Sequence, residues 1–370
     1  LYTNIGRGHP FYLDGIVEIL KNQNKLKFEI HDVFAISKRL SLSAWQLART
    51  LYHFGSTDSL IGNLYNRLRD KTEYHRKSLP MELMGRGIRK KFLDDDTPLV
   101  VDHPVLVGLL AGKKNLIYQH GEIAVPKQAV VKGAAFVFVP LESSAASFID
   151  GGYDRNQVFA TGLCIEPRLV EQSTTAYESR IKRFGASEPL VGAFFSSGAE
   201  PKPHLNRLTI AAMAVSNAGG KAIVFAKRDG KLNKMLFKKL VKSGNGLELL
   251  SYEPREELDN LTAERFAVFD YIVSPSHERT NWALGLGLPM FVLEPAIGPF
   301  APMNRSALLE AGVAEGIVSL EEATLFGQRL ETLRQSGKLA HMAQAGWKKH
   351  PVIGFQMIAD FLINKYARNS

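Results

Sequence analysis

Short apolar segments alternate with helix-length amphipathic segments along nearly the whole chain, and this alternation constrains the fold most. Parallel strands need a crossover connection, usually a helix, so the pattern predicts βαβ units built on parallel sheets. The expected strands are residues 1–4, 27–34, 99–102, 115–119, 134–140 and 157–161 in the first half, and 189–195, 221–226, 247–252, 271–274 and 289–293 in the second.

This alternation of predicted strands and helices occurs once in each half of the chain, and 370 residues is a length that suits two domains. We therefore expect an α/β fold with two Rossmann-like, doubly wound parallel-sheet domains facing a central cleft, followed by a helical tail over residues 320–366. The expected domains are residues 1–168, with a basic helical insertion at about 38–92, and residues 169–350. Residues 351–370 are expected to form a helix that packs back on the first domain. Ligands of such sheets bind at the carboxyl ends of the strands.

The net charge of +9 is concentrated in two segments. Residues 65–92 hold nine Lys or Arg against three acidic residues, and residues 227–242 hold seven against one. The second segment has the spacing of an amphipathic surface helix. The first mixes basic with apolar residues, which favours an anionic membrane surface. Neither segment contains a recognised nucleic-acid-binding module, so nucleic acid is not an expected partner.

Composition also excludes several classes of protein. The single cysteine, Cys164, rules out a disulfide framework and a cysteine-rich zinc site, and it fits a reducing compartment. No apolar run approaches the ~18 residues of a membrane-spanning helix. The expected location is cytoplasmic, peripheral to the inner face of a membrane. Because the chain begins with Leu1 rather than Met, upstream residues are expected as well.

In the first half, polar residues follow three predicted strands. Gly8 and His9 open a helix after the first strand, and His9 could act as a general base near neutral pH. Phe11 replaces the third glycine of the dinucleotide fingerprint, which disfavours an NAD enzyme. Asp102 could orient His9, or could simply cap a helix. His120 and Glu122 follow the next strand. No motif with metal-ligand spacing is present, and we expect no metal.

In the second half, two loops suit a phosphate group. Ser196, Ser197 and Gly198 follow a predicted strand with small side chains and available main-chain N–H groups. The stretch 270–312 carries a strand, a polar turn and a short helix, and it brings several helix N-termini to one point, as a nucleoside diphosphate requires. The turn residues are Ser276, His277, Glu278, Arg279 and Thr280.

These motifs resemble the GT-B glycosyltransferases, and most closely the lipid-linked transferases that make the second peptidoglycan lipid intermediate or galactolipids. Residues 6–9 resemble the family's first glycine-rich loop, residues 116–122 its strand ending in His-Glu, and residues 195–199 its donor loop. Residues 158–167 resemble the stretch that closes the first domain, and residues 286–289 and 304–312 the end of the donor signature. The chain differs where the family places a ribose-binding glutamate and a threonine, since it has Trp282 and Arg279.

The resemblance implies an inverting, metal-independent sugar transferase without a cofactor. Its donor is a nucleotide-diphosphate sugar held by Gly8 and by residues 196–198 and 276–280. The acceptor is a hydroxyl group, with a lipid as the candidate that the resemblance suggests, on the side of His120 and Glu122, and His9 and Asp102 are the catalytic pair. Two alternatives remain open, namely a sugar-nucleotide epimerase or hydrolase of the same fold, and a non-catalytic protein that binds nucleotide sugars or polyanions. The sequence implies no oligomeric state.

Overall fold

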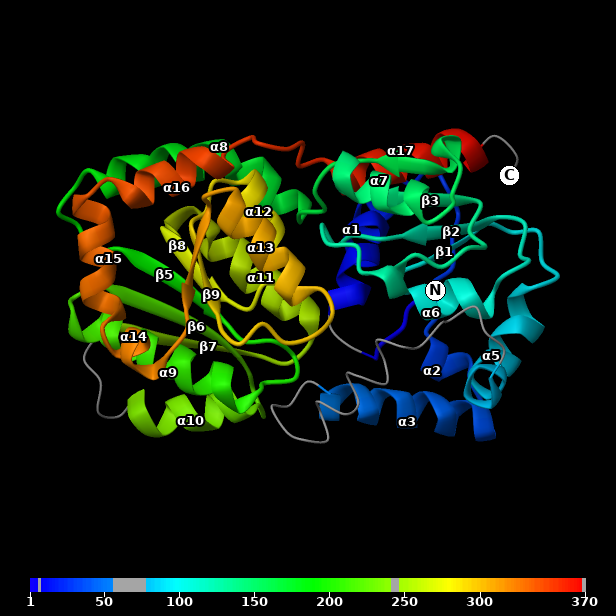
Figure 1. The fold of residues 1–370 in the computed structure, drawn as a ribbon, viewed down its shortest axis with the longest axis horizontal. Coiled ribbons are helices and arrows are strands. Elements are labelled where there is room, and N and C mark those ends of the chain that lie inside the picture. The colour runs from blue at the N-terminus through cyan, green and yellow to red at the C-terminus, as the bar shows by residue number, and fades with distance from the viewer. Residues whose placement is uncertain (6–7, 56–77, 241–245, 368–370) are drawn as a thin grey trace. The chain divides into compact units, whose positions relative to one another are not determined.

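A computed structural model describes residues 1–5, 8–55, 78–240 and 246–367. The chain divides into two compact units (Figure 1). Unit 1 comprises Leu1–Pro167 and Pro351–Ser370, and unit 2 comprises Arg168–His350. Among the described residues, no helix is both long and apolar enough to cross a membrane.

Unit 1 contains a parallel sheet of four strands in the order β1-β2-β3-β4. The strands are β1 (Leu99–Val101), β2 (Leu116–Gln119), β3 (Phe136–Val139) and β4 (Val158–Ala160). Its α-helices are α1 (Gly8–Gln23), α2 (Val33–Ile36), α3 (Arg39–Gly55), α5 (Leu79–Phe92), α6 (Pro104–Leu109), α7 (Glu142–Asp150) and α17 (Gly354–Tyr366). Two 3₁₀ turns, η1 (Lys127–Ala129) and η2 (Arg155–Gln157), precede β3 and β4.

The first residues of the chain pair with residues 31–33, but only through isolated contacts. The Tyr2 N–H donates to the His31 carbonyl at 2.8 Å, and the Val33 N–H donates to the Tyr2 carbonyl at 3.0 Å. The strands predicted at residues 1–4 and 27–34 are therefore reduced to one bridge between Tyr2 and Asp32. Asp32 ends the extended segment because its carboxylate accepts from the Phe34 N–H at 2.7 Å and caps α2.

The last helix of the chain belongs to unit 1. In α17, Phe355 and Ile358 join the buried cluster formed by Phe11 and Ile16 of α1. The two helices approach closely because α1 has Gly15 at the contact, where an added Cβ would lie 2.1 Å from the Phe355 ring.

Unit 2 contains a parallel sheet of six strands in the order β10-β9-β8-β5-β6-β7. The strands are β5 (Val191–Phe195), β6 (Lys221–Lys227), β7 (Leu247–Tyr252), β8 (Tyr271–Ser274), β9 (Met290–Leu293) and β10 (Ala314–Ile317). The helices are α8 (Pro167–Phe184), α9 (Lys202–Asn217), α10 (Lys231–Leu240), α11 (Arg255–Arg265), η3 (Phe266–Val268), α12 (Thr280–Gly285), α13 (Ala301–Glu310), α14 (Leu320–Thr324), α15 (Phe326–Gln335) and α16 (Lys338–Gly346).

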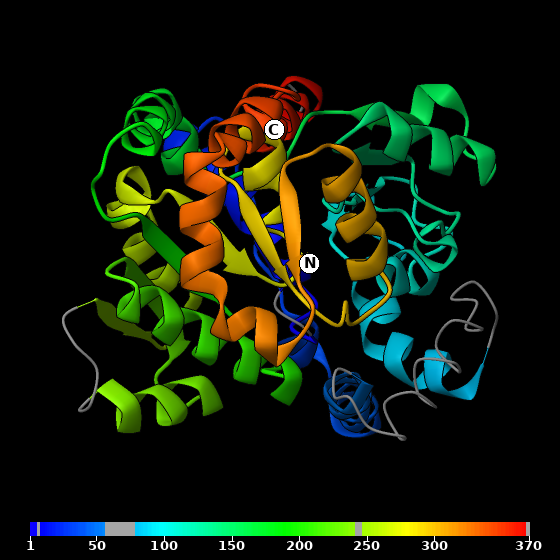
Figure 2. The ribbon, with the colours of Figure 1, turned by 60° about the vertical axis from the view of Figure 1, so that its left-hand side comes forward.

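Both faces of this second sheet are buried. On β6, Val224 joins a core cluster with α9, α15 and α16, while its neighbour Phe225 points to the other face and stacks on Phe195 at 4.5 Å. Helices accordingly lie on both sides of the sheet (Figures 1 and 2). The predicted fold class, two α/β units each built on a parallel sheet, is confirmed, and the strand order of the six-stranded sheet shows double winding.

The predicted helical tail is present and consists of separate helices. Residues 320–366 form four separate helices, and the first three belong to unit 2 while α17 belongs to unit 1. The Leu286 and Trp347 backbones meet in an isolated bridge after α16, which ends that helix before the chain returns to unit 1.

Candidate functional site

The strand order of unit 2 defines one switch point. From β5 the chain moves to β6 and β7 on one side of the sheet, and then to β8, β9 and β10 on the other side. Ligands of doubly wound sheets bind beside the carboxyl ends of the two strands at which the order reverses, here β5 and β8. The two loops singled out in the sequence, residues 196–198 and 276–280, follow those two strands directly.

Arg279 connects the two loops. Its guanidinium lies 4.0 Å from the centre of the Phe195 ring, at the end of β5, and 5.2 Å from the ring of Trp282. Its Nη1 donates to the Glu278 carboxylate at 2.8 Å, and the Arg279 residue is only 8% exposed. The Nε–H of Arg279 and the hydroxyl of Ser196 are buried without a hydrogen-bond partner among the described residues. The arrangement holds a cation rigidly at the switch point.

Ser276 and Thr280 are occupied by the structure of the turn itself. The Ser276 hydroxyl donates to the Ala301 carbonyl at 2.8 Å, and Asn304 donates to the Ser276 carbonyl at 3.0 Å. The Thr280 hydroxyl donates to the His277 carbonyl. These bonds attach the turn to α13 and begin α12. Ser196, Ser197 and His277, also predicted to contact a ligand, are partly exposed residues, although the Ser196 hydroxyl itself is buried.

Trp282 stands where the resembled family has its ribose-binding glutamate, and it is a core residue. It is 1% exposed and packs edge-on against Phe195 and Phe266. The two nearby carboxylates are held by arginines, Glu278 by Arg279 and Glu294 by Arg305.

His204, in the first turn of α9, was not identified from the sequence. It is 1% exposed, and its Nε2–H donates to the Pro295 carbonyl at 2.7 Å. Its Nδ1 then carries the lone pair, and within the described ranges this atom has no hydrogen-bond partner. Burial lowers the pKa of His204 to about 4, and the proximity of His277 acts in the same direction. A histidine in the first turn of the helix after β5 is the signal that could have identified it.

In unit 1, the predicted site residues lie at the carboxyl ends of β1 and β2 and at the start of α1. Thr3 fixes the end of β1, because its hydroxyl donates to the Asp102 carboxylate at 2.9 Å. The main-chain carbonyl of Asp102 accepts from Nδ1–H of His9 at 2.9 Å. The structure thus brings His9 and Asp102 together, but the carbonyl performs the orienting role expected of the carboxylate. Gly8 is the first residue of α1, while Gly6 and Arg7 lie outside the described residues.

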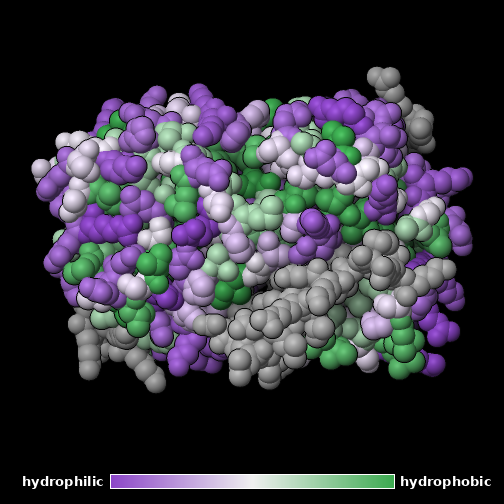
Figure 3. All heavy atoms as spheres, in the orientation of Figure 1, coloured by the Kyte–Doolittle hydropathy of each residue, from purple (hydrophilic) through white to green (hydrophobic). Residues whose placement is uncertain are grey.

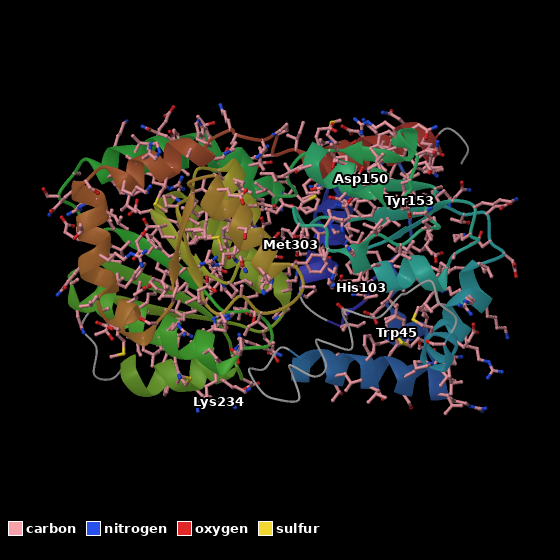
Figure 4. The ribbon with its side chains drawn as sticks, in the orientation of Figure 1. Trp45, His103, Asp150, Tyr153, Lys234 and Met303 are labelled. Atoms are coloured by element: carbon pink, nitrogen blue, oxygen red, sulfur yellow. The ribbon has the colours of Figure 1, made fainter. Side chains whose placement is uncertain are left out.

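Three imidazoles gather at this edge, and hydrogen bonds fix the tautomer of each. His103, the N-cap of α6 (Figure 4), accepts from the Val105 N–H at 3.1 Å through Nδ1. His120 accepts from the Tyr118 hydroxyl at 3.1 Å through Nδ1 and donates to the Ala124 carbonyl at 3.0 Å through Nε2. Protonating Nδ1 of His103 or Nδ1 of His120 would break the hydrogen bond that this atom accepts. His9 has its lone pair on Nε2, so it gains a proton without losing its bond to Asp102.

Burial keeps these imidazoles neutral. It lowers the pKa of His9 to about 4 against a small opposing effect of the Asp102 bond, and it lowers the pKa of His120 to about 4. The His9 ring lies 4.4 Å from the His103 ring, and burial together with a charge on His9 lowers the pKa of His103. At pH 7 this edge offers a neutral proton acceptor.

Glu122 is 6% exposed and follows Gly121, where an added Cβ would lie 1.9 Å from the Tyr12 ring. This turn therefore fits directly against α1. Within the described ranges, no group of three or more His, Cys, Asp or Glu side chains has an arrangement that could hold a metal ion.

Comparison with known proteins identifies the fold. No family model and no curated protein matches the chain. Among solved structures, the UDP-GlcNAc 2-epimerase from Neisseria meningitidis bound to UDP-GlcNAc superposes with a TM-score of 0.59 at 12% identity, over 96% of each chain. The MnaA–UDP co-structure from S. aureus gives 0.57 at 14% identity, over 98% of this chain and 95% of that one. A 2-epimerase described as putative, from Listeria monocytogenes, gives 0.56 at 12% identity, over 100% and 95%.

Proposed function

We propose, from the two-unit GT-B fold that the chain shares with these structures, that it is a glycosyltransferase using a nucleotide-diphosphate sugar. The observation that carries the proposal is the state of His9. Its Nδ1–H is committed to the Asp102 carbonyl and its pKa is lowered to about 4, so the imidazole is neutral with its lone pair on Nε2. At neutral pH such a group is unprotonated, and it would take up the hydroxyl proton as the bond to the anomeric carbon forms; its lowered pKa makes it a weaker base than an exposed histidine.

The donor would bind at the switch point of unit 2. The diphosphate oxygens would accept hydrogen bonds from main-chain N–H groups of residues 196–198 and from the Arg279 Nε–H. Arg279 is held in place by Phe195, Trp282 and Glu278, so its charge needs no reorganisation when the leaving group develops negative charge. Because Trp282 is in the core, the ribose is expected to contribute less to recognition than the phosphates do.

The proposed reaction inverts the anomeric carbon. His9 Nε2 takes the proton of the acceptor hydroxyl while its oxygen forms a bond to the anomeric carbon from the opposite side. The bond from that carbon to the diphosphate oxygen breaks, and the nucleoside diphosphate leaves with the electron pair. His120 and Glu122 would line the acceptor side. The acceptor would be a lipid-borne hydroxyl, and no metal ion or cofactor is required in this scheme.

Replacing the base separates chemistry from donor binding. We expect His9→Gln to lower turnover of the transfer reaction by roughly 10²–10⁴-fold. Binding of UDP, read as a thermal shift, should be unchanged, because the groups proposed to hold the diphosphate, residues 196–198 and Arg279, belong to unit 2. Arg279→Met is the matched variant, since it should weaken UDP binding and leave His9 in place. Undiminished transfer by His9→Gln would remove the base assignment.

An epimerase or hydrolase is the second candidate, because all three structures compared above are described as UDP-GlcNAc 2-epimerases or as bound to UDP. Incubating the chain with UDP-GlcNAc and no acceptor distinguishes the two. Epimerised or free sugar would favour the second candidate, whereas a transferase should leave the donor intact. If no nucleotide diphosphate shifts the melting temperature, a non-catalytic role would follow.

A further inference from the structure

His103 lies beside the base of the proposed reaction. The centres of the His9 and His103 rings are 4.4 Å apart, and the rings meet edge to face. Both residues are partly exposed, so a bound molecule can reach both rings. In the area of Figure 3 that corresponds to α1 and β2 in Figure 1, hydrophobic residues reach the surface of unit 1. A hydrogen bond formed in apolar surroundings is stronger than one formed in water.

The residue after His103 fixes the orientation of its ring. Pro104 restricts the preceding residue to extended backbone, and His103 has φ −137° and ψ 136°. Because proline has no N–H to offer at the first position of α6, the His103 side chain caps the helix at the next N–H, that of Val105, through Nδ1. Burial lowers the pKa of His103, so the ring is neutral at pH 7. Its single proton is therefore on Nε2.

The rings of His9 and His103 are attached to the same stretch of main chain. Nδ1 of His9 faces the Asp102 carbonyl, and Nδ1 of His103 faces the Val105 N–H. Since Nε2 lies on the other side of an imidazole from the bond that Nδ1 makes, both Nε2 atoms face away from this stretch. Hydrogen bonds of about 2.8 Å let one oxygen bridge two nitrogens up to about 5.6 Å apart. Ring centres 4.4 Å apart are compatible with that spacing.

The two Nε2 atoms are complementary to one kind of group. His9 offers a lone pair and His103 offers an N–H, whereas an alcohol hydroxyl donates one hydrogen bond and accepts others. A carboxylate has no proton to give His9 at neutral pH, and an ammonium group has no lone pair to accept from His103. The pair therefore favours an alcohol as the molecule that binds here.

We propose that His103 is a second catalytic residue on the acceptor side, whose Nε2–H donates to the oxygen of the acceptor hydroxyl while His9 Nε2 takes its proton. The inference rests on the proposed function and adds a residue to it. One lone pair of the oxygen accepts from His103, which orients the other toward the anomeric carbon. His103 loses no proton. Its N–H stabilises the negative charge that develops on the oxygen as the hydroxyl proton moves to His9.

The variant His103→Ser removes the ring and keeps the helix cap, because serine is a preferred N-cap residue. With UDP-GlcNAc as donor and octyl glucoside as the alcohol, we expect UDP release to fall by roughly 10²-fold. UDP binding should be unchanged, since the groups proposed to hold the diphosphate belong to unit 2. The variant His103→Asn keeps both a cap and an N–H donor of shorter reach, and its rate should lie between the two.

The matched control is Ser319→Ala, which removes a cap of the same 3.1 Å length from α14 in unit 2. It should lower the melting temperature and leave UDP release unchanged. A double variant tests whether the two histidines act on one hydroxyl. If they do, adding His103→Ser to His9→Gln should cost less than about tenfold, because residues that act as a unit are not additive.

Nitrogen-15 NMR of the histidine side chains provides a measurement that needs no turnover. At pH 7 we expect the proton of His103 on Nε2 and that of His9 on Nδ1, and octyl glucoside should shift the Nε2 resonances of both rings. A proton on Nδ1 of His103, or a shift confined to His9, would overturn the proposal. So would full UDP release by His103→Ser in a chain that is otherwise active. If the original chain releases no UDP, the proposed function fails, and the NMR result still decides the geometry of the pair.

Discussion

Replacing Trp282 with glutamate tests whether this position can serve a ligand at all. Trp282 is 1% exposed and contacts the rings of Phe195 and Phe266 at centroid distances of 5.8 and 6.2 Å. Loss of a fully buried tryptophan costs about 3–5 kcal/mol, and a buried carboxylate adds a desolvation penalty. Arg279, whose guanidinium lies 5.2 Å from the ring, offers an attraction of about 3 kcal/mol at an effective dielectric constant of 20. Arg279 is already paired with Glu278, so this attraction offsets only part of the cost. We therefore expect Trp282→Glu to lower the free energy of unfolding by about 4 kcal/mol.

Urea unfolding followed by circular dichroism measures this loss, with Trp282→Phe as the control. The control retains an aromatic ring in the core and should lose about 1–2 kcal/mol. Neither variant should gain affinity for UDP over dUDP in a calorimetric titration. Trp282→Glu with the unfolding midpoint of the original chain and new ribose selectivity would refute the placement of this side chain in the core.

Two further predictions concern buried polar groups. The folded pKa of His204, about 4, lies below the ordinary value of 6.5, so its contribution to stability is complete above pH 6.5 and is lost as the pH falls through 4. The stability advantage of the original chain over His204→Gln should shrink by about 3 kcal/mol between pH 7 and pH 4 in urea unfolding, and an advantage independent of pH would contradict this. Thr3→Val removes the hydroxyl that donates to the Asp102 carboxylate. Burial raises the pKa of Asp102 to about 6. The substitution should therefore lower the free energy of unfolding by about 1–3 kcal/mol at pH 7.5, and by less at pH 5, where the folded carboxyl is protonated. Thr3→Ser should restore the stability, and equal losses at both pH values would oppose the assignment.

The strands of the second sheet were largely predictable, because a strand buried on both faces is a short continuous apolar run. The prediction for residues 271–274 matches β8 residue for residue, and the prediction for residues 289–293 exceeds β9 by one residue; both strands are buried throughout. The strand β10 was missed because Ala314–Ile317 contains a glycine and a glutamate and has no such run. Residues 27–34 were wrongly predicted as a strand. The side chains of Phe28 and Ile30, which alternate along this segment, are not buried in a core and are 36% and 49% exposed.

The positions of the candidate site residues were predictable, but their contacts were not. Carboxyl ends of neighbouring parallel strands meet at one edge, so His9 and Asp102 were expected close together. Which oxygen of Asp102 holds His9 depends on Thr3, which takes the carboxylate and leaves the carbonyl. Arg180 was missed altogether. It is fully buried and donates to the carbonyls of Phe269, Leu286 and Gly287 at 2.9 to 3.1 Å, and no local pattern in the sequence distinguishes it from a surface arginine of α8.

Hydrogen exchange in the presence and absence of UDP tests the central claim most directly, because it locates binding without requiring turnover. A nucleoside diphosphate at the β5–β8 switch point should slow exchange of the main-chain N–H groups in residues 195–200 and 276–282. Protection confined to other segments, or no protection at saturating UDP, would contradict the account.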